Sequence, residues 1–210
     1  MMCLKRCRRG IVGIEAAIVL IAFVIIAAAL AYVVVNTGFY ASQKSKETIM
    51  RGIGEAASSL QLDGSVIAYT SNSQVKYIIV PVKVSVGKEG IDVSNKSVAV
   101  TVRISGSASV YMPNIYNGTY DGFDATNITV TLNEITGDDP VAYIAIVNSD
   151  GDELLESSEK GFLIIYLGRN VGAAEYDKVK VEVKTSLGAS LVVEREIPVG
   201  LSPNDFVDLG

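Results

Sequence analysis

One acidic segment carries the side chains best suited to bind a metal ion. Asn148, Asp150, Asp152 and Glu159 fall at positions 1, 3, 5 and 12 of a loop with EF-hand spacing, whose oxygen ligands suit Ca²⁺. Position 6 is Glu153, where the EF-hand requires a glycine, and no helix is predicted on either side. A solvated turn between two strands is the favoured interpretation. Calcium in this loop is kept as a hypothesis, and we expect no other cofactor.

The residues needed for most enzymatic chemistry are missing from the sequence. The chain has no histidine, and both of its cysteines, Cys3 and Cys7, lie within the first ten residues. No glycine-rich phosphate loop or serine nucleophile motif is present, and the paired carboxylates Asp138 and Asp139 lie in a predicted turn. We therefore expect no enzyme. A net charge of −5, without a basic face beyond the N-terminus, also argues against a nucleic-acid partner.

Three asparagines lie in Asn-x-Ser/Thr sequences and are candidates for N-glycosylation. Asn95 and Asn117 fall in predicted turns, whereas Asn127 lies on the polar side of a predicted strand. If this part of the chain is exported, we expect at least one of them to carry a glycan. An oligosaccharyltransferase is then one expected partner.

A long apolar helix is the main element that the sequence predicts. The twenty residues from Ala16 to Val35 contain no charge, and a helix of that length spans about 30 Å, enough to cross a bilayer. The helical pattern then continues to Leu60, with Ile49 and Ile53 among the apolar positions of a one-sided stripe. We predict a single helix from Ile11 to Leu60.

Glu15 is the one charge within the start of this apolar helix. It can be an ordinary helix N-terminal residue that interacts favourably with the helix dipole at a membrane interface. It can also pair with the α-amino group of a neighbouring subunit, because a charge within an apolar bundle needs a partner. Gly13 has two interpretations as well: a feature that a peptidase recognises, or a small residue at a crowded helix start.

The N-terminus allows three interpretations. A basic start followed by an apolar run is typical of a cleaved secretory signal, but this run is long and the helix continues beyond it. A permanent anchor with a cytoplasmic N-terminus fits the length of the run. A short basic leader that ends at Gly10, with cleavage before the apolar helix, explains more of the residues and has the arrangement of a class III signal peptide.

Two stretches of the sequence resemble a known family. The first is the segment from Arg9 to Phe23, RGIVGIEAAIVLIAF, and the second is the segment from Gly38 to Glu47, GFYASQKSKE. Both are similar to archaellins, the filament subunits of the archaeal flagellum. The resemblance is specific over roughly the first sixty residues. It is looser beyond them, where DGDELLE at 150–156 is similar to a turn common in the family.

The resemblance implies a division of the chain and a function. It implies a leader at residues 1–10 cleaved between Gly10 and Ile11, a filament-core and membrane helix at residues 11–62, and an outer domain at residues 63–210. The expected product is a homopolymer, alone or together with related archaellins, on the archaeal cell surface, with the precursor held in the cytoplasmic membrane. The expected partners are a prepilin peptidase and a membrane platform with its ATPase. The predicted assembly residues share the helix: Gly13, Glu15, Ile18, Phe23, Ile49 and Ile53.

The pattern after Asp63 changes from helical spacing to alternation. Residues 82–86, 98–105, 128–132 and 179–184 alternate between apolar and polar positions, and each predicts a strand with one solvated face. Residues 141–147 and 162–167 are continuous apolar runs and suit central strands. We predict an α+β protein, in which the helix precedes an antiparallel β-sandwich of immunoglobulin-like layout.

Two alternatives to the archaellin interpretation remain. An archaeal adhesion pilin of the type IV kind has the same leader and assembly helix, and the segment from Gly38 to Glu47 is what favours an archaellin over it. A membrane-anchored extracellular β-sandwich domain would keep its N-terminus uncleaved and would form no polymer.

Overall fold

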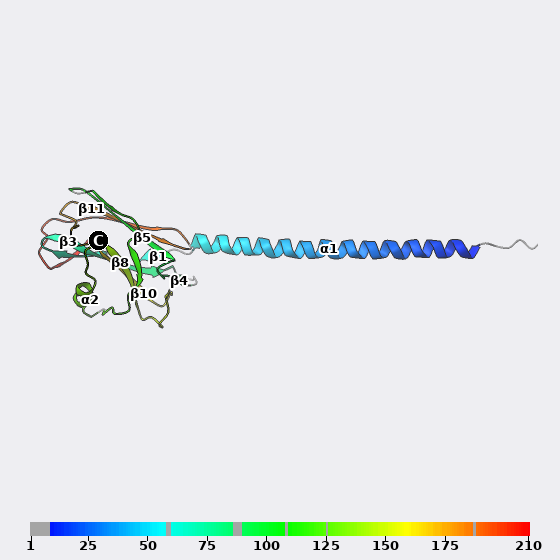
Figure 1. Ribbon diagram of the computed structural model, residues 1–210, viewed down its shortest axis with the longest axis horizontal. Helices are drawn as coiled ribbons and strands as arrows, with labels where there is room; N and C mark the ends of the chain where they lie inside the picture. The colour runs from blue at the N-terminus through cyan, green and yellow to red at the C-terminus, as the bar shows by residue number, and fades with distance from the viewer. Residues whose placement is uncertain (1–8, 58–59, 86–89, 108, 125, 187) are drawn as a thin grey trace, which may run out of the picture. The chain divides into compact units, whose positions relative to one another are not determined.

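The computed structural model describes residues 9–57, 60–85, 90–107, 109–124, 126–186 and 188–210 (Figure 1). The chain divides into two units, Met1–Gly52 and Ile53–Gly210, and each is described by itself. The elements in chain order are α1 (Arg9–Ala57), β1 (Leu60–Leu62), β2 (Ile67–Ser71), β3 (Gln74–Val84), β4 (Ile91–Asp92), β5 (Val98–Ser105), β6 (Val110–Met112), β7 (Tyr116–Thr119), α2 (Ile128–Glu134), β8 (Val141–Val147), β9 (Leu154–Leu155), β10 (Lys160–Tyr166), β11 (Lys178–Thr185), β12 (Leu191–Glu196) and β13 (Phe206–Asp208).

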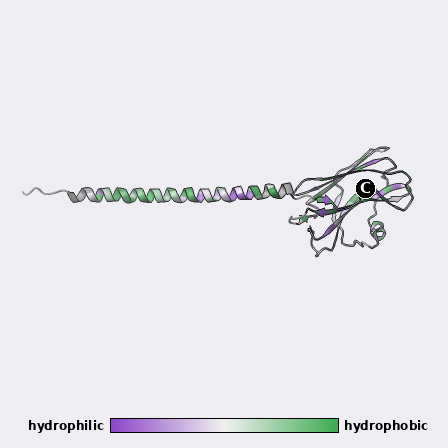
Figure 2. Ribbon diagram, turned by 180° about the vertical axis from the view of Figure 1, so that it is seen from behind, coloured by the Kyte–Doolittle hydropathy of each residue, from purple (hydrophilic) through white to green (hydrophobic). Residues whose placement is uncertain are grey.

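The long N-terminal helix is confirmed as α1, which has 49 residues. Its segment Gly13–Met50 is long and apolar enough to cross a membrane, by length and composition. Figure 2 shows the hydrophobic colour along most of the first part of α1 and hydrophilic positions in the second part. No proline interrupts the helix, and its ten alanines are strong helix formers.

The sequence predicted a helix that reaches Leu60 and a helical segment that ends at residue 62. Both bounds are wrong. The helix ends at Ala57, and Leu60–Leu62 is a strand that pairs antiparallel with β3, with Leu60 opposite Val84. Leu60 is only 4% exposed, within the core of the sandwich. Burial of this side chain in the sheet outweighs a helical preference of a few tenths of a kcal/mol per residue.

The second unit contains two sheets that pack on one core. The larger has the strand order β13-β2-β3-β10-β8-β7, with β1 also paired to β3, and the smaller has the order β12-β11-β5-β6. The pair β4-β9 forms a separate two-stranded sheet. Between described strands, β7 with β8 is the one parallel pair. The antiparallel β-sandwich that the alternating pattern predicts is confirmed, with the parallel pair β7–β8 as an exception.

Alternate residues of the strands form the core between the two sheets. On β5 the side chains of Val98, Val100, Val102 and Ile104 are at most 3% exposed, while Arg103 on the same strand faces solvent. Residues of β3, β8, β10 and β11 belong to the same cluster. Burying each large aliphatic side chain contributes about 1.5–3 kcal/mol, so this period-two pattern fixes the register of the sheets.

The predicted strand at residues 128–132 is wrong, because these residues form the short helix α2. Leu132 and Ile135 are 1% and 4% exposed, while Val130 is 48% exposed. Both buried side chains belong to a second apolar cluster on the outer face of the larger sheet, with Ile79 and Ile164. Positions 128, 132 and 135 have helical spacing, which the short alternating run conceals.

Candidate assembly interface

The described side chains of α1 form an apolar surface without partners in the chain. Every described side chain from residue 13 to residue 53 is exposed. The predicted assembly residues Ile18, Phe23, Ile49 and Ile53 are 61%, 72%, 60% and 56% exposed. Soluble monomers rarely expose contiguous apolar patches of more than a few hundred Å². Such a surface therefore requires lipid or other protein chains around it.

Glu15 lies on one face of α1 with Val19 and Phe23, and these side chains line a shallow recess. Among the described side chains, none forms an ion pair or hydrogen bond with Glu15. A Cβ added at Gly13 would meet no atom within 4 Å, so space in the isolated helix does not require a glycine there. The glycine leaves room for close approach of a second helix.

The proposed leader and cleavage site are only partly described. Residues 1–8, with Cys3 and Cys7, lie outside the described residues, and the backbones of Gly10 and Ile11 belong to α1. Cleavage between Gly10 and Ile11 stays a prediction.

In the polar part of α1, several side chains form hydrogen bonds or ion pairs within the helix itself. The Thr37 hydroxyl donates to the Val33 carbonyl at 2.8 Å, and the Thr48 hydroxyl donates to the Lys44 carbonyl at 2.9 Å. Lys44 also forms an ion pair with Glu47 at 2.8 Å. Because these bonds stay within the helix, the threonines can enter apolar surroundings without leaving a hydroxyl unpaired.

The acidic segment uses its carboxylates to bind backbone amides. Glu159 is 4% exposed and accepts the N–H groups of Asp150 at 3.3 Å and Glu156 at 3.0 Å. Asp152 accepts the N–H of Leu154 at 2.9 Å. Asn148 is exposed, with φ +63°. Within the described residues, no three His, Cys, Asp or Glu side chains are grouped so that they could hold a metal ion. The calcium hypothesis stays a prediction without support from these positions.

The three glycosylation candidates all have exposed side chains. Asn95 lies in a turn, as predicted, whereas Asn117 lies in β7 and not in a turn. The Asn117 amide donates to the Tyr143 hydroxyl at 2.8 Å. Asn127 directly precedes α2, where its side chain makes no capping hydrogen bond, so its predicted place on a strand is wrong. Glycan attachment at these positions stays a prediction.

A groove on the outer face of the larger sheet was not predicted from the sequence. It has a volume of about 470 Å³, and its apolar lining includes Ile67, Pro81, Phe162 and Phe206. Its rim includes Asp63, whose carboxylate binds two lysines, Lys83 at 2.7 Å and Lys160 at 3.0 Å. These hydrogen bonds hold the pKa of Asp63 below its ordinary value. The signal in the sequence was the continuous apolar run at 162–167, which places apolar side chains on both faces of β10.

The aromatic side chains of the outer face extend from this groove. Phe206 contacts Tyr69 at a ring-centroid distance of 4.9 Å, and Tyr77 contacts Tyr166 at 4.9 Å. Burial, with the neighbouring Tyr166 and Tyr69, raises the pKa of Tyr77 to about 12. Tyr77 therefore stays neutral at physiological pH.

The chain is similar to archaeal flagellins. The profile of a family described as archaeal-type flagellin matches residues 10–195. A probable flagellin 1 of Aeropyrum pernix is 46% identical over 210 residues, which cover 98% of this chain and 100% of that protein. A probable flagellin 1 of Archaeoglobus fulgidus is 30% identical over 90% of each chain.

Solved structures give the same result at the level of the fold. The archaeal flagellum of Methanospirillum hungatei strain JF1 matches with a TM-score of 0.61 and 27% identity, over 90% of this chain and 94% of that chain. The archaeal flagellin FlaB1 from Methanocaldococcus jannaschii matches with a TM-score of 0.53 and 15% identity, over 73% of this chain and 97% of that chain. The second match supports the fold alone.

Proposed function

The chain belongs to the archaeal-type flagellin family, and from this premise we propose that it is a structural subunit of the archaeal flagellum filament and serves swimming. The family consists of structural filament subunits and not of enzymes. The observation that carries the proposal is α1, an apolar helix whose described side chains are all exposed. A filament core of parallel copies of α1 gives that surface the apolar surroundings it needs.

Burial of α1 keeps subunits in the assembled filament, because a subunit released into water would expose its apolar helix again. Each large apolar side chain that leaves water contributes about 1.5–3 kcal/mol, and α1 exposes many of them, including Phe23 at 72%. The small residues of α1, among them Gly13 and Ala16, permit the close helix approach that dense packing in a bundle needs. Contacts between copies that do not close into a ring continue as an open helical filament.

Before assembly, α1 is inserted in the membrane. Its apolar segment has the length to span the bilayer, and a helix satisfies its own backbone hydrogen bonds there. A prepilin peptidase then cleaves between Gly10 and Ile11, and a membrane platform with its ATPase adds the subunit to the growing filament. In the filament core, the carboxylate of Glu15 pairs with the new α-amino group of Ile11 of a neighbouring subunit, because an unpaired charge in an apolar bundle is costly.

The β unit forms the outer surface of the filament outside the cell. Asn95, Asn117 and Asn127 all have exposed side chains, as attachment by an oligosaccharyltransferase requires. Their exposure supports glycosylation at each position equally. Mass spectrometry of peptides containing each asparagine, before and after enzymatic removal of N-glycans, tests each site separately.

Surface appendages sheared from cells provide the test of this function. We expect filaments by electron microscopy whose subunits begin at Ile11 when their N-terminus is sequenced, and swimming should be lost when the gene is deleted. If wild-type cells carry such filaments but the deletion strain still swims, the result would favour the adhesion pilin. A chain found only in membranes, uncleaved and never polymeric, would identify an anchored surface domain and overturn the proposal.

A further inference from the structure

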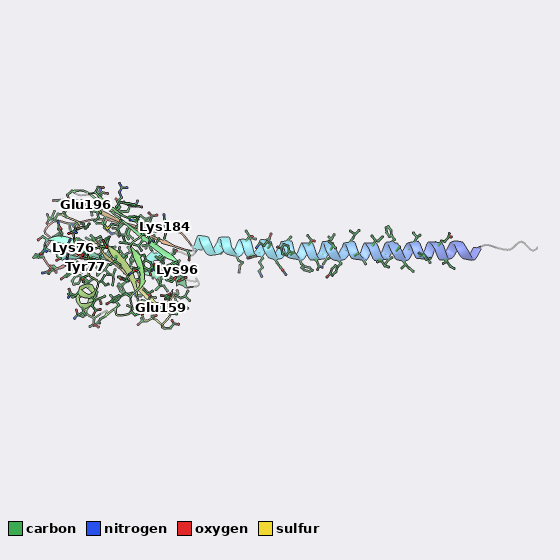
Figure 3. All side chains as sticks on the ribbon, in the orientation of Figure 1. Lys76, Tyr77, Lys96, Glu159, Lys184 and Glu196 are labelled. Carbon is green, nitrogen blue, oxygen red and sulfur yellow. The ribbon has the colours of Figure 1, made fainter. Side chains whose placement is uncertain are left out.

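Two side-chain amides interrupt the apolar surface of α1, whose side chains project from the helix over much of its length (Figure 3). Asn36 and Gln43 are exposed and lie seven residues apart, which is two turns and about 10 Å along one face of the helix. On the same face, Ile25 lies three turns before Asn36 and is 63% exposed. Met50 lies two turns after Gln43 and is 62% exposed. The amides therefore lie within the apolar surface and not beyond its end.

The helix itself leaves these two amides without hydrogen-bond partners. A side-chain amide has two N–H donors and a carbonyl acceptor, whereas each backbone N–H inside a helix already bonds to the carbonyl four residues earlier. Thr37 and Thr48 differ, because each hydroxyl donates to a carbonyl of the preceding turn. Among the described residues, neither Asn36 nor Gln43 forms a side-chain hydrogen bond. When α1 becomes surrounded by other chains, both amides thus need partners from outside their own helix.

The polar groups in this part of α1 form a stripe along one face. Spacings of four, three and four residues align Asn36, Tyr40, Gln43 and Glu47, and we call these four residues the polar stripe. Tyr40 is 69% exposed, and its hydroxyl can both donate and accept. Glu47 forms an ion pair with Lys44 at 2.8 Å, so its charge is compensated within the helix. The polar stripe therefore offers donors and acceptors about once per turn without an uncompensated charge.

We infer that the amides of Asn36 and Gln43 form hydrogen bonds with the polar stripe of α1 in a neighbouring copy and thereby fix the axial register of the subunits. The inference rests on the proposed function, because copies packed in a filament core cover this face. The polar stripe also continues the face of Ile18, a predicted assembly residue that lies two turns before Ile25.

The chemistry of the polar stripe favours a second copy as its partner. Lipid tails have no hydrogen-bonding groups, so they cannot satisfy an amide. An amide both donates and accepts, so the polar stripe of a second copy offers groups that match it. Side-chain amides of asparagine and glutamine form such hydrogen bonds between helices in apolar surroundings. The same stripe can therefore serve as donor surface and acceptor surface in every subunit.

Apolar contacts by themselves do not define how far one α1 is displaced along the next. The apolar effect is non-directional, and α1 repeats alanine, valine and isoleucine along its length, so several displacements bury similar areas. Hydrogen bonds are directional and form only where donors meet acceptors. A single polar residue in an otherwise apolar helix interface can set the register in this way, at a cost in stability. Asn36 and Gln43 would give the filament one helical symmetry among several that apolar burial permits.

Apolar substitutions of similar size test the register. Cryo-electron microscopy compares filaments of the native chain with those of Asn36→Leu, Gln43→Met and the double variant. The matched control is Thr37→Val, because the Thr37 hydroxyl is bonded within its own helix. We expect one helical symmetry for the native and control filaments, and mixed symmetries or lost assembly for the amide variants. Amide variants that keep the native symmetry and the native temperature of disassembly would overturn the inference.

A map of the native filament covers the case in which the amide variants do not assemble. We expect the amides of Asn36 and Gln43 to lie within hydrogen-bond distance of polar-stripe side chains of a neighbouring copy. Amides that face a water-filled space, or that bond only within their own helix, would contradict the inference while leaving the filament function intact. A native chain that forms no filament at all would instead contradict the proposed function.

Discussion

At the scale of single residues, Asp177 organises two loops of the β unit through one buried carboxylate. It accepts the N–H of Ser107 at 2.7 Å, the Ser107 hydroxyl at 2.9 Å and the N–H of Ala174 at 2.9 Å. A Cβ added at Gly106 would lie 2.0 Å from the same carboxylate, so the neighbouring turn is built closely around it. The sequence shows an aspartate between a tyrosine and a lysine and gives no sign of this role.

Removing this carboxylate should destabilise the fold strongly. We expect Asp177→Ala to lower the free energy of unfolding by about 1–3 kcal/mol, because it leaves several part-buried donors without an acceptor. Asp139→Ala is the matched control, since Asp139 is exposed and should change stability by less than about 0.5 kcal/mol. Urea unfolding followed by circular dichroism measures both. Equal midpoints for the two variants would contradict the structural role.

The same carboxylate should make stability depend on acid pH. Burial alone would raise the pKa of Asp177, but the hydrogen bonds from Ser107 and Ala174 outweigh it and hold the pKa below its ordinary value of 3.8. The stabilisation is therefore complete above that value and is lost as the pH falls through the lower folded pKa. We expect the stability difference between the native chain and Asp177→Asn to shrink below about pH 4. A difference that is constant from pH 7 to pH 2 would refute this linkage.

Tyr176 should oppose folding stability, because its φ of +65° lies in the left-handed region that bulky side chains rarely adopt. Replacing it with glycine removes a left-handed strain of about 1–2 kcal/mol and adds about 0.5–1 kcal/mol of chain entropy to the unfolded state. We expect Tyr176→Gly to stabilise the β unit by up to about 1 kcal/mol. Gly137→Ala, at an exposed glycine without positive φ, is the comparison. A lower midpoint of thermal unfolding for Tyr176→Gly would show that the position is unstrained.

At the scale of elements, α2 covers part of the outer sheet face with two side chains. Leu132→Ala should lower the free energy of unfolding by about 2–5 kcal/mol, because Leu132 is 1% exposed against Ile79 and Ile164. Val130→Ala in the same helix is the control, since Val130 is 48% exposed. If these residues formed the strand predicted from alternation, Val130 and Leu132 would share a face and the two variants would behave alike. Thermal unfolding decides between the two arrangements.

The elements that the sequence predicts well are those in which one periodic pattern extends over many residues. The β5 and β11 strands alternate over eight residues each, and α1 is apolar over more than a bilayer thickness, so burial and local preference agree. The segments whose secondary structure was predicted wrongly are short. Residues 128–132 satisfy both periods, and Leu60–Leu62 follows the helix so closely that only its pairing with β3 shows it to be a strand.

Sites within one segment could be predicted from the sequence, whereas sites built from segments far apart in the sequence could not. The exposed apolar residues of α1, such as Phe23, could be predicted because a single helix contains the whole surface. The groove could not, because its lining comes from segments near residues 65, 81, 161 and 207, which only the sheet topology brings together. For the same reason the sequence suggested a ligand role for Glu159, whereas its carboxylate binds backbone amides of its own loop.

At the scale of the whole molecule, the two units have opposite relations to water. The described side chains of α1 are all exposed and mostly apolar, whereas the β unit buries its own apolar residues in two clusters. The β unit therefore has a complete core by itself, while α1 depends on lipid or on other subunits. In the function proposed above, this division would let the chain pass from a membrane to a filament without refolding its outer part.

The boundary between the units can be tested by two truncations that differ by one strand. A chain of residues 60–210 keeps β1, and we expect it to be a soluble monomer that unfolds cooperatively. A chain of residues 63–210, the boundary suggested by the sequence, loses Leu60, which is 4% exposed, and the pairing of β1 with β3. We expect it to be less stable by about 1.5–3 kcal/mol, the value of burying one large apolar side chain. Sedimentation and urea unfolding measure both chains. Equal stabilities would place the true start of the β unit after β1, and aggregation of both chains would mean that the β unit needs α1 or its neighbours in order to fold.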